Sequence, residues 1–85
     1  MKQISYVITD PEGMHARPAG LLVKEANQFV SAITIKKNEK EADAKRIFAV
    51  MGLAAKKDET IHVTADGSDE EVAISAIENF LKNNL

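Results

Sequence analysis

The residues most capable of chemistry lie together near the N-terminus, in the stretch Gly13-Met14-His15-Ala16-Arg17-Pro18-Ala19. An imidazole nitrogen can act as a nucleophile toward phosphorus, and a guanidinium presents a planar fork of donors that suits phosphate oxygens. A histidine and an arginine two residues apart therefore indicate a site at which His15 accepts a phosphoryl group and Arg17 contacts that group.

The pattern after His15 predicts a helix that begins at Ala16. Proline is acceptable at position 18 because it falls in the first turn. The apolar stripe of this helix consists of Ala19, Leu22, Ala26 and Phe29. His15 is then the N-cap, beside amides that have no partner within the helix and carry about half a positive charge. These first amides, that of Ala16 included, would donate to a bound anion, and their field favours a neutral imidazole with one nitrogen free as a nucleophile.

The remaining periodicity predicts the elements that position this site. Residues 4–8, 31–37, 40–44 and 61–66 alternate as one-faced strands, and residues 45–53 and the segment after Ser68 have helical spacing. The order β-α-β-β-α-β-α predicts an α+β fold with helices over one side of a mainly antiparallel sheet. The low β propensity of residues 40–44 indicates an edge strand, joined to its neighbour by a turn at Asn38-Glu39.

The last helix has its own start and stop signals. Ser68 and Glu71 stand three residues apart, which predicts a capping box. The expected buried stripe comprises Val72, Ala73, Ala76, Ile77, Phe80 and Leu81. Asn83-Asn84 predicts fraying before Leu85.

The helix predicted over residues 45–53 is too short to bury all of its apolar side chains. We expect some of Ile47, Phe48 and Met51 to be exposed, and a small apolar patch with a polar rim is typical of a surface that docks a partner. The alternative is that all three belong to the core. On the first helix Leu21 lies off the buried stripe near Lys24, which either contacts acidic partners or belongs to a solvated face.

Length and composition restrict the function further. The 85 residues make one domain, residues 1–85, too small to enclose a substrate cleft, so function should lie on the surface. A formal charge of -2 without a basic run argues against nucleic acid as a partner. With no cysteine, no signal-peptide pattern and no long apolar run, we expect a cytoplasmic protein without membrane insertion.

The second histidine does not suggest a further site. His62 falls on the polar face of a predicted strand, and nothing in the sequence requires it to converge with His15 in an acid/base pair. Neither histidine has the neighbours that a metal site needs. We therefore expect His62 to be a surface residue, and we expect neither a metal nor a cofactor.

The stretch around His15 resembles the active-site motif of the histidine-containing phosphocarrier (HPr) family of the bacterial phosphoenolpyruvate-dependent sugar phosphotransferase system. The resemblance covers the whole chain and includes Ala44-Lys45 and Ala65-Asp66-Gly67-Ser68-Asp69. It implies an open-faced β-sandwich with three helices on one face of a four-stranded antiparallel sheet.

By the same resemblance, His15 would accept a phosphoryl group on its δ nitrogen from enzyme I and donate it to the IIA domain of a sugar permease. Arg17 would contact the phosphate, and the patch around Ile47, Phe48 and Met51 would dock both partners. The chain would be a carrier of phosphoryl groups rather than an enzyme acting alone.

The sequence departs from the family pattern at several positions. Arg46 stands where Gram-positive members carry a regulatory serine, so the switch and the corepressor role that depend on a serine kinase should be absent. We hypothesise that Arg46 contacts an acidic partner surface. Glu12 replaces a common serine or asparagine, and we expect it to point to solvent and to lower the stability of the phosphorylated state modestly. Ala54 and Asp58 replace frequent glycines, which leaves the local loop shape open.

Two other functions remain open on the same fold. The first is a regulatory module that docks a target protein through its second helix. Arg46 leaves this alternative open, because it replaces the serine that the usual regulation needs. A phosphocarrier in a regulatory chain without sugar uptake is the other. Because carriers that exchange partners quickly need small interfaces, we expect a monomer.

Overall fold

The computed structural model describes residues 1–85. Seven elements follow one another: β1 (Lys2–Val7), α1 (Ala16–Ala26), β2 (Ala32–Lys37), β3 (Lys40–Asp43), α2 (Ile47–Gly52), β4 (Thr60–Asp66) and α3 (Glu70–Asn84). The predicted element order is therefore confirmed. None of the helices is long and apolar enough to span a membrane.

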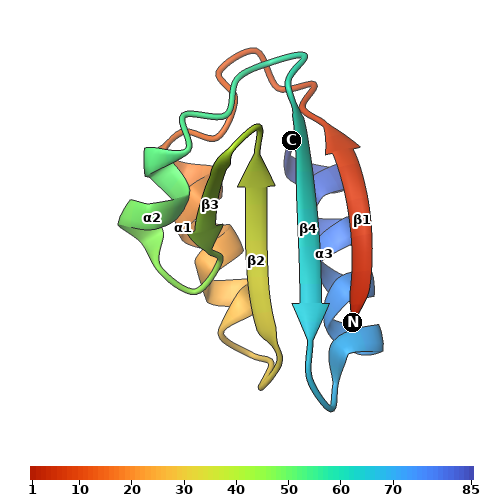
Figure 1. Ribbon diagram of the computed structural model, residues 1–85. Coiled ribbons are helices and arrows are strands. Elements are labelled where there is room, and N and C mark those ends of the chain that lie inside the picture. Colours follow the sequence, from red (N-terminus) through yellow and green to blue (C-terminus); the bar gives the residue numbers. More distant parts are fainter.

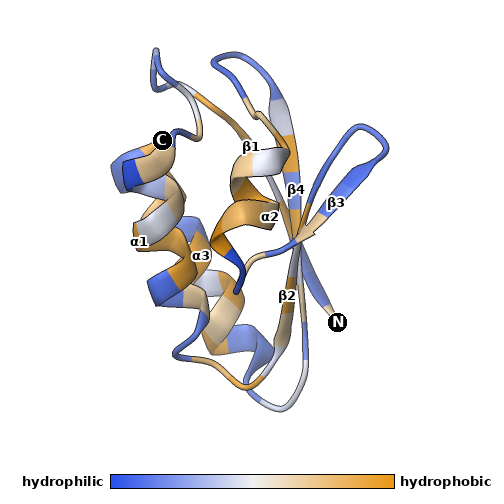
Figure 2. Ribbon diagram, turned by 90° about the vertical axis from the view of Figure 1, so that its left-hand side faces the viewer, coloured by the Kyte–Doolittle hydropathy of each residue, from blue (hydrophilic) through white to orange (hydrophobic).

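The strands form one four-stranded sheet in the order β1-β4-β2-β3, and every neighbouring pair is antiparallel. Figure 1 shows β4 in the middle of the sheet beside β1, with β3 at the opposite edge, as its weak β propensity predicts. The helices lie on one side of the sheet, and the other side is uncovered (Figure 2). The α+β open-faced sandwich predicted from the sequence is thus confirmed.

The core lies between the sheet and the helices. Alternate residues of β2 and β4 point into this space, while α1 and α3 each turn one apolar stripe toward it. Its largest fully buried side chains are Ile8, Leu22, Ile33, Ile35, Val50, Leu53, Ile61, Val63, Ile77 and Leu81. No buried side-chain nitrogen or oxygen lacks a hydrogen-bond partner. This packing holds the N-terminus of α1 at one end of the sheet.

The predicted capping box at the start of α3 is wrong. The N-cap is Asp69, and no side chain caps the helix. The Asp69 carboxylate instead accepts hydrogen bonds from the backbone amides of Val30 (2.9 Å) and Ser31 (3.0 Å), and from the Ser31 hydroxyl. Asp69 thus binds residues that are distant in the sequence, at the end of the α1–β2 connection, rather than the first amides of its own helix. The partner of the Gly67 amide is the Oε1 atom of Glu70 (3.1 Å).

Three further expectations about helix limits and burial are wrong. Val72 is 64% exposed, because the buried stripe of α3 follows Ala73, Ile77 and Leu81 and Val72 lies outside it. Asn83 and Asn84 do not fray, since Leu85 is buried and its carbonyl accepts from the Asp10 amide at 2.8 Å. Phe29 packs against the core from the turn after α1, which ends at Ala26.

The predicted two-residue hairpin turn is confirmed. Lys37 pairs with Lys40, and Asn38 and Glu39 form the loop between them. Only Asn38 has a positive φ, at 55°, so the position of Glu39 does not require glycine. The turn gives β3 its place at the edge, from which the chain passes into α2.

Candidate functional site

His15 lies at the N-terminus of α1, as predicted. It is the N-cap residue, with an extended backbone (φ −85°, ψ −176°), and its side chain makes no capping hydrogen bond. The amides of Ala16 and Arg17 donate to no group of the protein, because they belong to the first turn and no side chain reaches them. A half-buried imidazole and two unpartnered amides therefore lie together at the positive end of a helix.

The turn before His15 is held by four backbone amides in succession. The Glu12 amide donates to the Asp10 carboxylate (2.7 Å), and the Gly13 amide donates to the Asp10 carbonyl (3.0 Å). The Met14 amide donates to the carbonyl of Ala55 (2.8 Å), and the His15 amide donates to the Gly13 carbonyl (2.9 Å). This bonding fixes the backbone that carries the imidazole.

Glycine is required at position 13 for two reasons. Its φ is +67°, in the left-handed region, and a Cβ atom there would collide with the Ala55 carbonyl oxygen and lie 2.9 Å from the Cα atom of Lys56. The turn thus packs backbone to backbone on the connection between α2 and β4. The positions of Ala55 and Lys56 in turn decide where His15 sits.

The supporting connection contains the two residues that replace frequent glycines of the family. Ala54 has a φ of 51° and Asp58 a φ of 72°, so both keep the left-handed backbone without being glycine. The ammonium group of Lys37 donates to the Ala54 carbonyl (3.1 Å) and to the Glu59 carboxylate (3.3 Å). The loop shape that the sequence left open is therefore one that favours glycine.

Glu59 completes this support. Its Oε1 atom also accepts the Lys56 amide at 2.7 Å. That backbone donor, followed by the Lys37 ammonium group, holds the pKa of the Glu59 carboxyl below its ordinary value. The charged carboxylate thus ties the buried lysine of β2 to the backbone on which Gly13 rests.

The His15 side chain opens into a shallow surface depression. Its lining residues are Asp10, Glu12, His15, Arg17, Pro18, Leu21 and Asn84. Arg17 is exposed and forms no ion pair, so its guanidinium is available to an anion at His15. On the other side, the Oε2 atom of Glu12 lies 3.5 Å from Nε2 of His15. Glu12 is 77% exposed, as predicted, but its carboxylate is close to the imidazole rather than directed away.

Asp10, Glu12 and His15 are close enough to share a cation. Each offers one ligand atom, and these atoms lie within 4.8 Å of one another. An Asp10 oxygen already accepts the Glu12 amide, and this exposed turn needs no metal to form. We therefore assign no metal to this cluster. The spacing of these residues along the sequence did not predict that they lie together.

Exposed apolar side chains lie on α1 and α2, and one of them, Leu21, also lines the depression. Phe48 is 85% exposed, Leu21 44% and Met51 36%, whereas Ile47 is half-buried against the core. The prediction that the short helix leaves apolar residues exposed is confirmed for Phe48 and Met51. The alternative, in which Ile47, Phe48 and Met51 are all core residues, is wrong, because α2 spans only six residues and cannot bury all of them.

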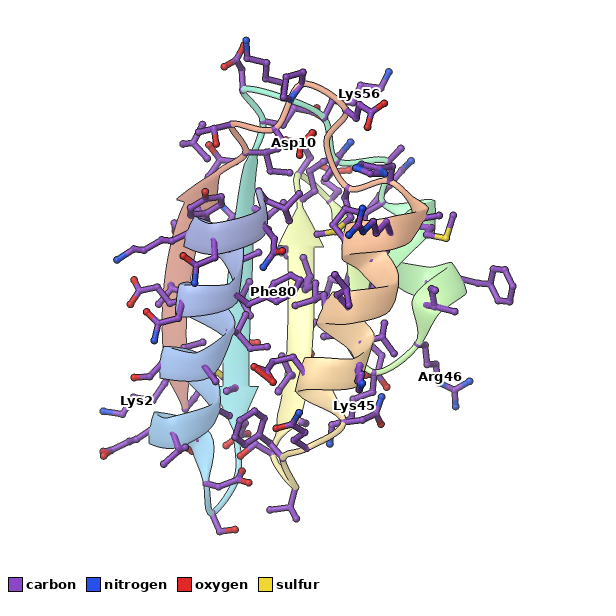
Figure 3. All side chains as sticks on the ribbon, turned by 180° about the vertical axis from the view of Figure 1, so that it is seen from behind. Lys2, Asp10, Lys45, Arg46, Lys56 and Phe80 are labelled. Atoms are coloured by element: carbon purple, nitrogen blue, oxygen red, sulfur yellow. The ribbon has the colours of Figure 1, made fainter.

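Two basic residues belong to the same two helices as these apolar side chains. Lys24 is exposed on α1. Arg46 is the N-cap of α2 and is exposed, with its Nε atom 3.9 Å from the Asp43 carboxylate. Figure 3 shows Arg46 projecting from the body of the protein into solvent. The predicted partner-binding residues thus lie on two neighbouring helices, on the side of the molecule that carries His15.

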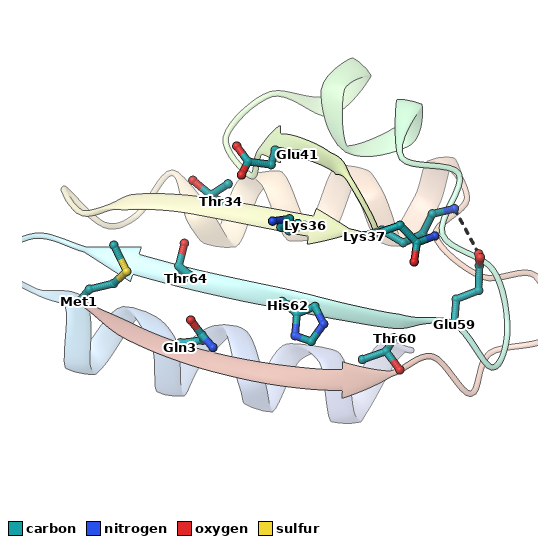
Figure 4. A pocket seen from close by; sticks show the side chains of 11 residues that line it. Met1, Gln3, Thr34, Lys36, Lys37, Glu41, Glu59, Thr60, His62 and Thr64 are labelled. Carbon is teal, nitrogen blue, oxygen red and sulfur yellow. Dashed lines mark hydrogen bonds and ion pairs between the residues drawn. The ribbon is translucent and has the colours of Figure 1, made fainter.

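His62 lies on the uncovered face of the sheet, among polar side chains that line a broad shallow basin (Figure 4). Its Nδ1 atom is 2.8 Å from the hydroxyl oxygen of Ser5 on the adjacent strand. It is exposed, as predicted. Because α1, which carries His15 at its N-terminus, lies on the other face of the sheet, the structure does not bring the two histidines together.

Comparisons with known proteins agree with this geometry. Residues 2–83 match the family model for the PTS HPr component phosphorylation site. The phosphocarrier protein HPr of Mycoplasma capricolum is 49% identical over 77 residues, which cover 91% of this chain and 86% of that protein.

Solved structures give the same picture. A histidine-containing phosphocarrier protein from Mycoplasma superposes with a TM-score of 0.94 at 45% identity, over 96% of this chain and 93% of that one. The catabolite repression protein Crh of Bacillus subtilis, described as a domain-swapped dimer, superposes with a TM-score of 0.79 at 32% identity, over 100% and 98% of the two chains.

Proposed function

The chain belongs to the HPr family of phosphocarrier proteins, and on this premise we propose that it accepts a phosphoryl group from enzyme I on His15 and passes it to IIA domains of sugar permeases. The observation that carries the proposal is the arrangement at the start of α1. An accessible imidazole stands beside the unpartnered amides of Ala16 and Arg17 and beside a guanidinium without an ion pair.

The chemistry is an in-line phosphoryl transfer. The Nδ1 lone pair forms a bond to phosphorus while the bond between phosphorus and the donor nitrogen breaks. The amides of Ala16 and Arg17 and the Arg17 guanidinium offset the charge on the phosphoryl oxygens. The reverse sequence delivers the group to an acceptor, so the chain serves as a carrier whose partners supply the alignment of the reacting atoms.

Both partners would dock on the surface formed by Leu21, Lys24, Arg46, Ile47, Phe48 and Met51. An apolar centre with a basic rim suits an acidic partner surface around an apolar contact. Since this surface is small, partners can exchange quickly, and we propose that the single domain of residues 1–85 acts as a monomer in the cytoplasm.

Arg46 changes the regulation that this surface can undergo. It carries no hydroxyl, so we propose that control by serine phosphorylation is absent and that Arg46 contacts acidic partner residues instead. Its Asp43 neighbour is 3.9 Å away and the pair is exposed, which leaves the guanidinium free to exchange partners. Unchanged transfer kinetics in Arg46→Ser would remove this role.

The decisive experiment measures the intact mass after incubation with phosphoenolpyruvate and enzyme I. We expect one acid-labile phosphoryl group on the wild type and on His62→Ala, and none on His15→Ala. His62→Ala is the matched control because it removes the other histidine of the chain. Phosphorylation of His15→Ala would refute the assignment.

A regulatory docking module is the second candidate. Arg46 in place of the regulatory serine and the 85% exposed Phe48 favour it, because docking uses them and needs no phosphoryl acceptor. Failure of an active enzyme I to phosphorylate the wild type, together with binding of a target protein that Phe48→Ala abolishes, would support this candidate over the carrier.

A further inference from the structure

Glu12 is placed to act on the imidazole of His15. Its Oε2 atom lies 3.5 Å from Nε2, and His15 is the partner in the one ion pair that Glu12 makes. The backbone between the two residues is fixed by the bonds of the Glu12, Gly13 and Met14 amides. The turn therefore keeps a carboxylate beside one particular ring nitrogen.

A carboxylate distinguishes the two nitrogens of a neutral imidazole. The ring carries one proton, and an ionised carboxylate only accepts hydrogen bonds, so Glu12 favours the tautomer with the proton on Nε2. The lone pair is then on Nδ1. The same negative charge repels a phosphoryl dianion that approaches Nε2, whereas Arg17 and the helix amides attract it.

We propose that Glu12 is a positioning residue that directs phosphorylation of His15 to Nδ1. The inference rests on the proposed function, and it adds the residue that selects the nitrogen. Asp10 is the other nearby carboxylate, but only Glu12 pairs with His15, and the Oδ1 atom of Asp10 accepts the Glu12 amide.

The proton balance of the step follows from this placement. The Nδ1 electron pair forms the bond to phosphorus, and the electron pair of the broken bond goes to the leaving nitrogen of the donor. The proton stays on Nε2 throughout, so the product is a phosphoimidazolium whose N–H faces Glu12. The carboxylate offsets the positive charge of that ring.

The first test reads the tautomer directly and needs no donor. Nitrogen-15 NMR of His15, at a pH at which the ring is neutral, gives the ratio of the Nε2–H to the Nδ1–H form. Because the pair is exposed, we expect Glu12→Gln to lower this ratio about twofold to fivefold. Glu39→Gln removes the same charge from a residue that neither pairs with His15 nor lines its depression, so it should leave the ratio unchanged. An unchanged ratio in Glu12→Gln, or an equal change in both variants, would overturn the proposal.

The second test reads the nitrogen that reacts. Phosphoramidate transfers a phosphoryl group to histidine with loss of ammonia, and phosphorus-31 NMR separates the Nδ1 and Nε2 isomers. In a His62→Ala background we expect a larger share of the Nδ1 isomer in the presence of Glu12 than in Glu12→Gln. Identical isomers in both would overturn the inference about Glu12. Because no enzyme I is present, this result is independent of whether enzyme I is the natural donor.

Discussion

Replacing Gly13 by alanine tests how far the backbone of the neighbouring loop determines the site. The new Cβ atom would meet the carbonyl of Ala55 and the Cα atom of Lys56, which are backbone atoms and cannot rotate away. The turn would have to move off the loop, and the hydrogen bond from the Met14 amide to Ala55 would be lost. His15 follows directly in the chain and would move with the turn.

The magnitude has three parts. A non-glycine residue in the left-handed region costs about 1–2 kcal/mol, and the lost hydrogen bond costs about 0.5–1.5 kcal/mol. Alanine restricts the unfolded chain and returns about 0.4–1 kcal/mol. The net destabilisation of Gly13→Ala is therefore about 0.5–3 kcal/mol. Gly52→Ala is the matched control: it lies in α2 with nothing within 4 Å of the added Cβ and should stabilise by about 0.5–1 kcal/mol.

Urea unfolding monitored by circular dichroism measures both changes in the free energy of unfolding. In thermal unfolding of a domain of this size, each kcal/mol corresponds to a shift of about 4–8 °C in Tm. We also expect Gly13→Ala to accept a phosphoryl group more slowly than its folded fraction explains, because small displacements of a nucleophile slow transfer. A Gly13→Ala protein as stable as the wild type, or a shift of the same sign in Gly52→Ala, would refute the reasoning from the backbone contact.

Ala54→Gly should stabilise the protein by about 0.5–1 kcal/mol in urea unfolding, because relief of its positive φ exceeds the entropy gained by the unfolded chain; destabilisation would contradict this. The hydroxyl of Ser31 and nearby amides lower the pKa of Asp69 below 3.8. Its stabilisation is present above that value and is lost as the pH falls through the lowered folded pKa, so Asp69→Asn should show less acid dependence of the unfolding midpoint in that window. Phe48→Ala should change stability by less than about 0.5 kcal/mol yet raise KM in transfer from enzyme I about tenfold, and an unchanged KM would exclude Phe48 from docking.

The elements and the acceptor were predictable because their signals are local. Hydrophobic alternation gives strand faces directly, and the weak β propensity of residues 40–44 predicted the edge position that β3 occupies. His15 precedes a stripe with helical spacing and a first-turn proline, which fixed it as the N-cap before any long-range contact was known. Helix length also predicted that some of Ile47, Phe48 and Met51 are exposed, but it did not distinguish Phe48 and Met51 from Ile47, which packs against the core.

The errors arose where a distant partner decides the outcome. Ser68 and Glu71 satisfy the spacing of a capping box, but Asp69 is held by Val30 and Ser31, and this tertiary contact sets the start of α3. Gly13 packs on Ala55, which is 42 positions away in the chain, and the spacing of residues along the sequence does not predict such a contact. The approach of the Glu12 carboxylate to His15 depends on the same turn and was missed for the same reason.

A phosphoryl carrier must expose its nucleophile to two partners and still present it in one geometry. Here the side chain of His15 makes no capping bond and stays accessible, while the order is supplied by backbone bonds before it and by the loop beneath Gly13. That loop is tied through Lys37 to the sheet, so the geometry of the acceptor is set by β2 and β4 rather than by groups that a partner must displace. Loosening this support should therefore slow transfer from the donor and transfer to the acceptor alike, whereas a change at Phe48 or Arg46 can affect one partner alone.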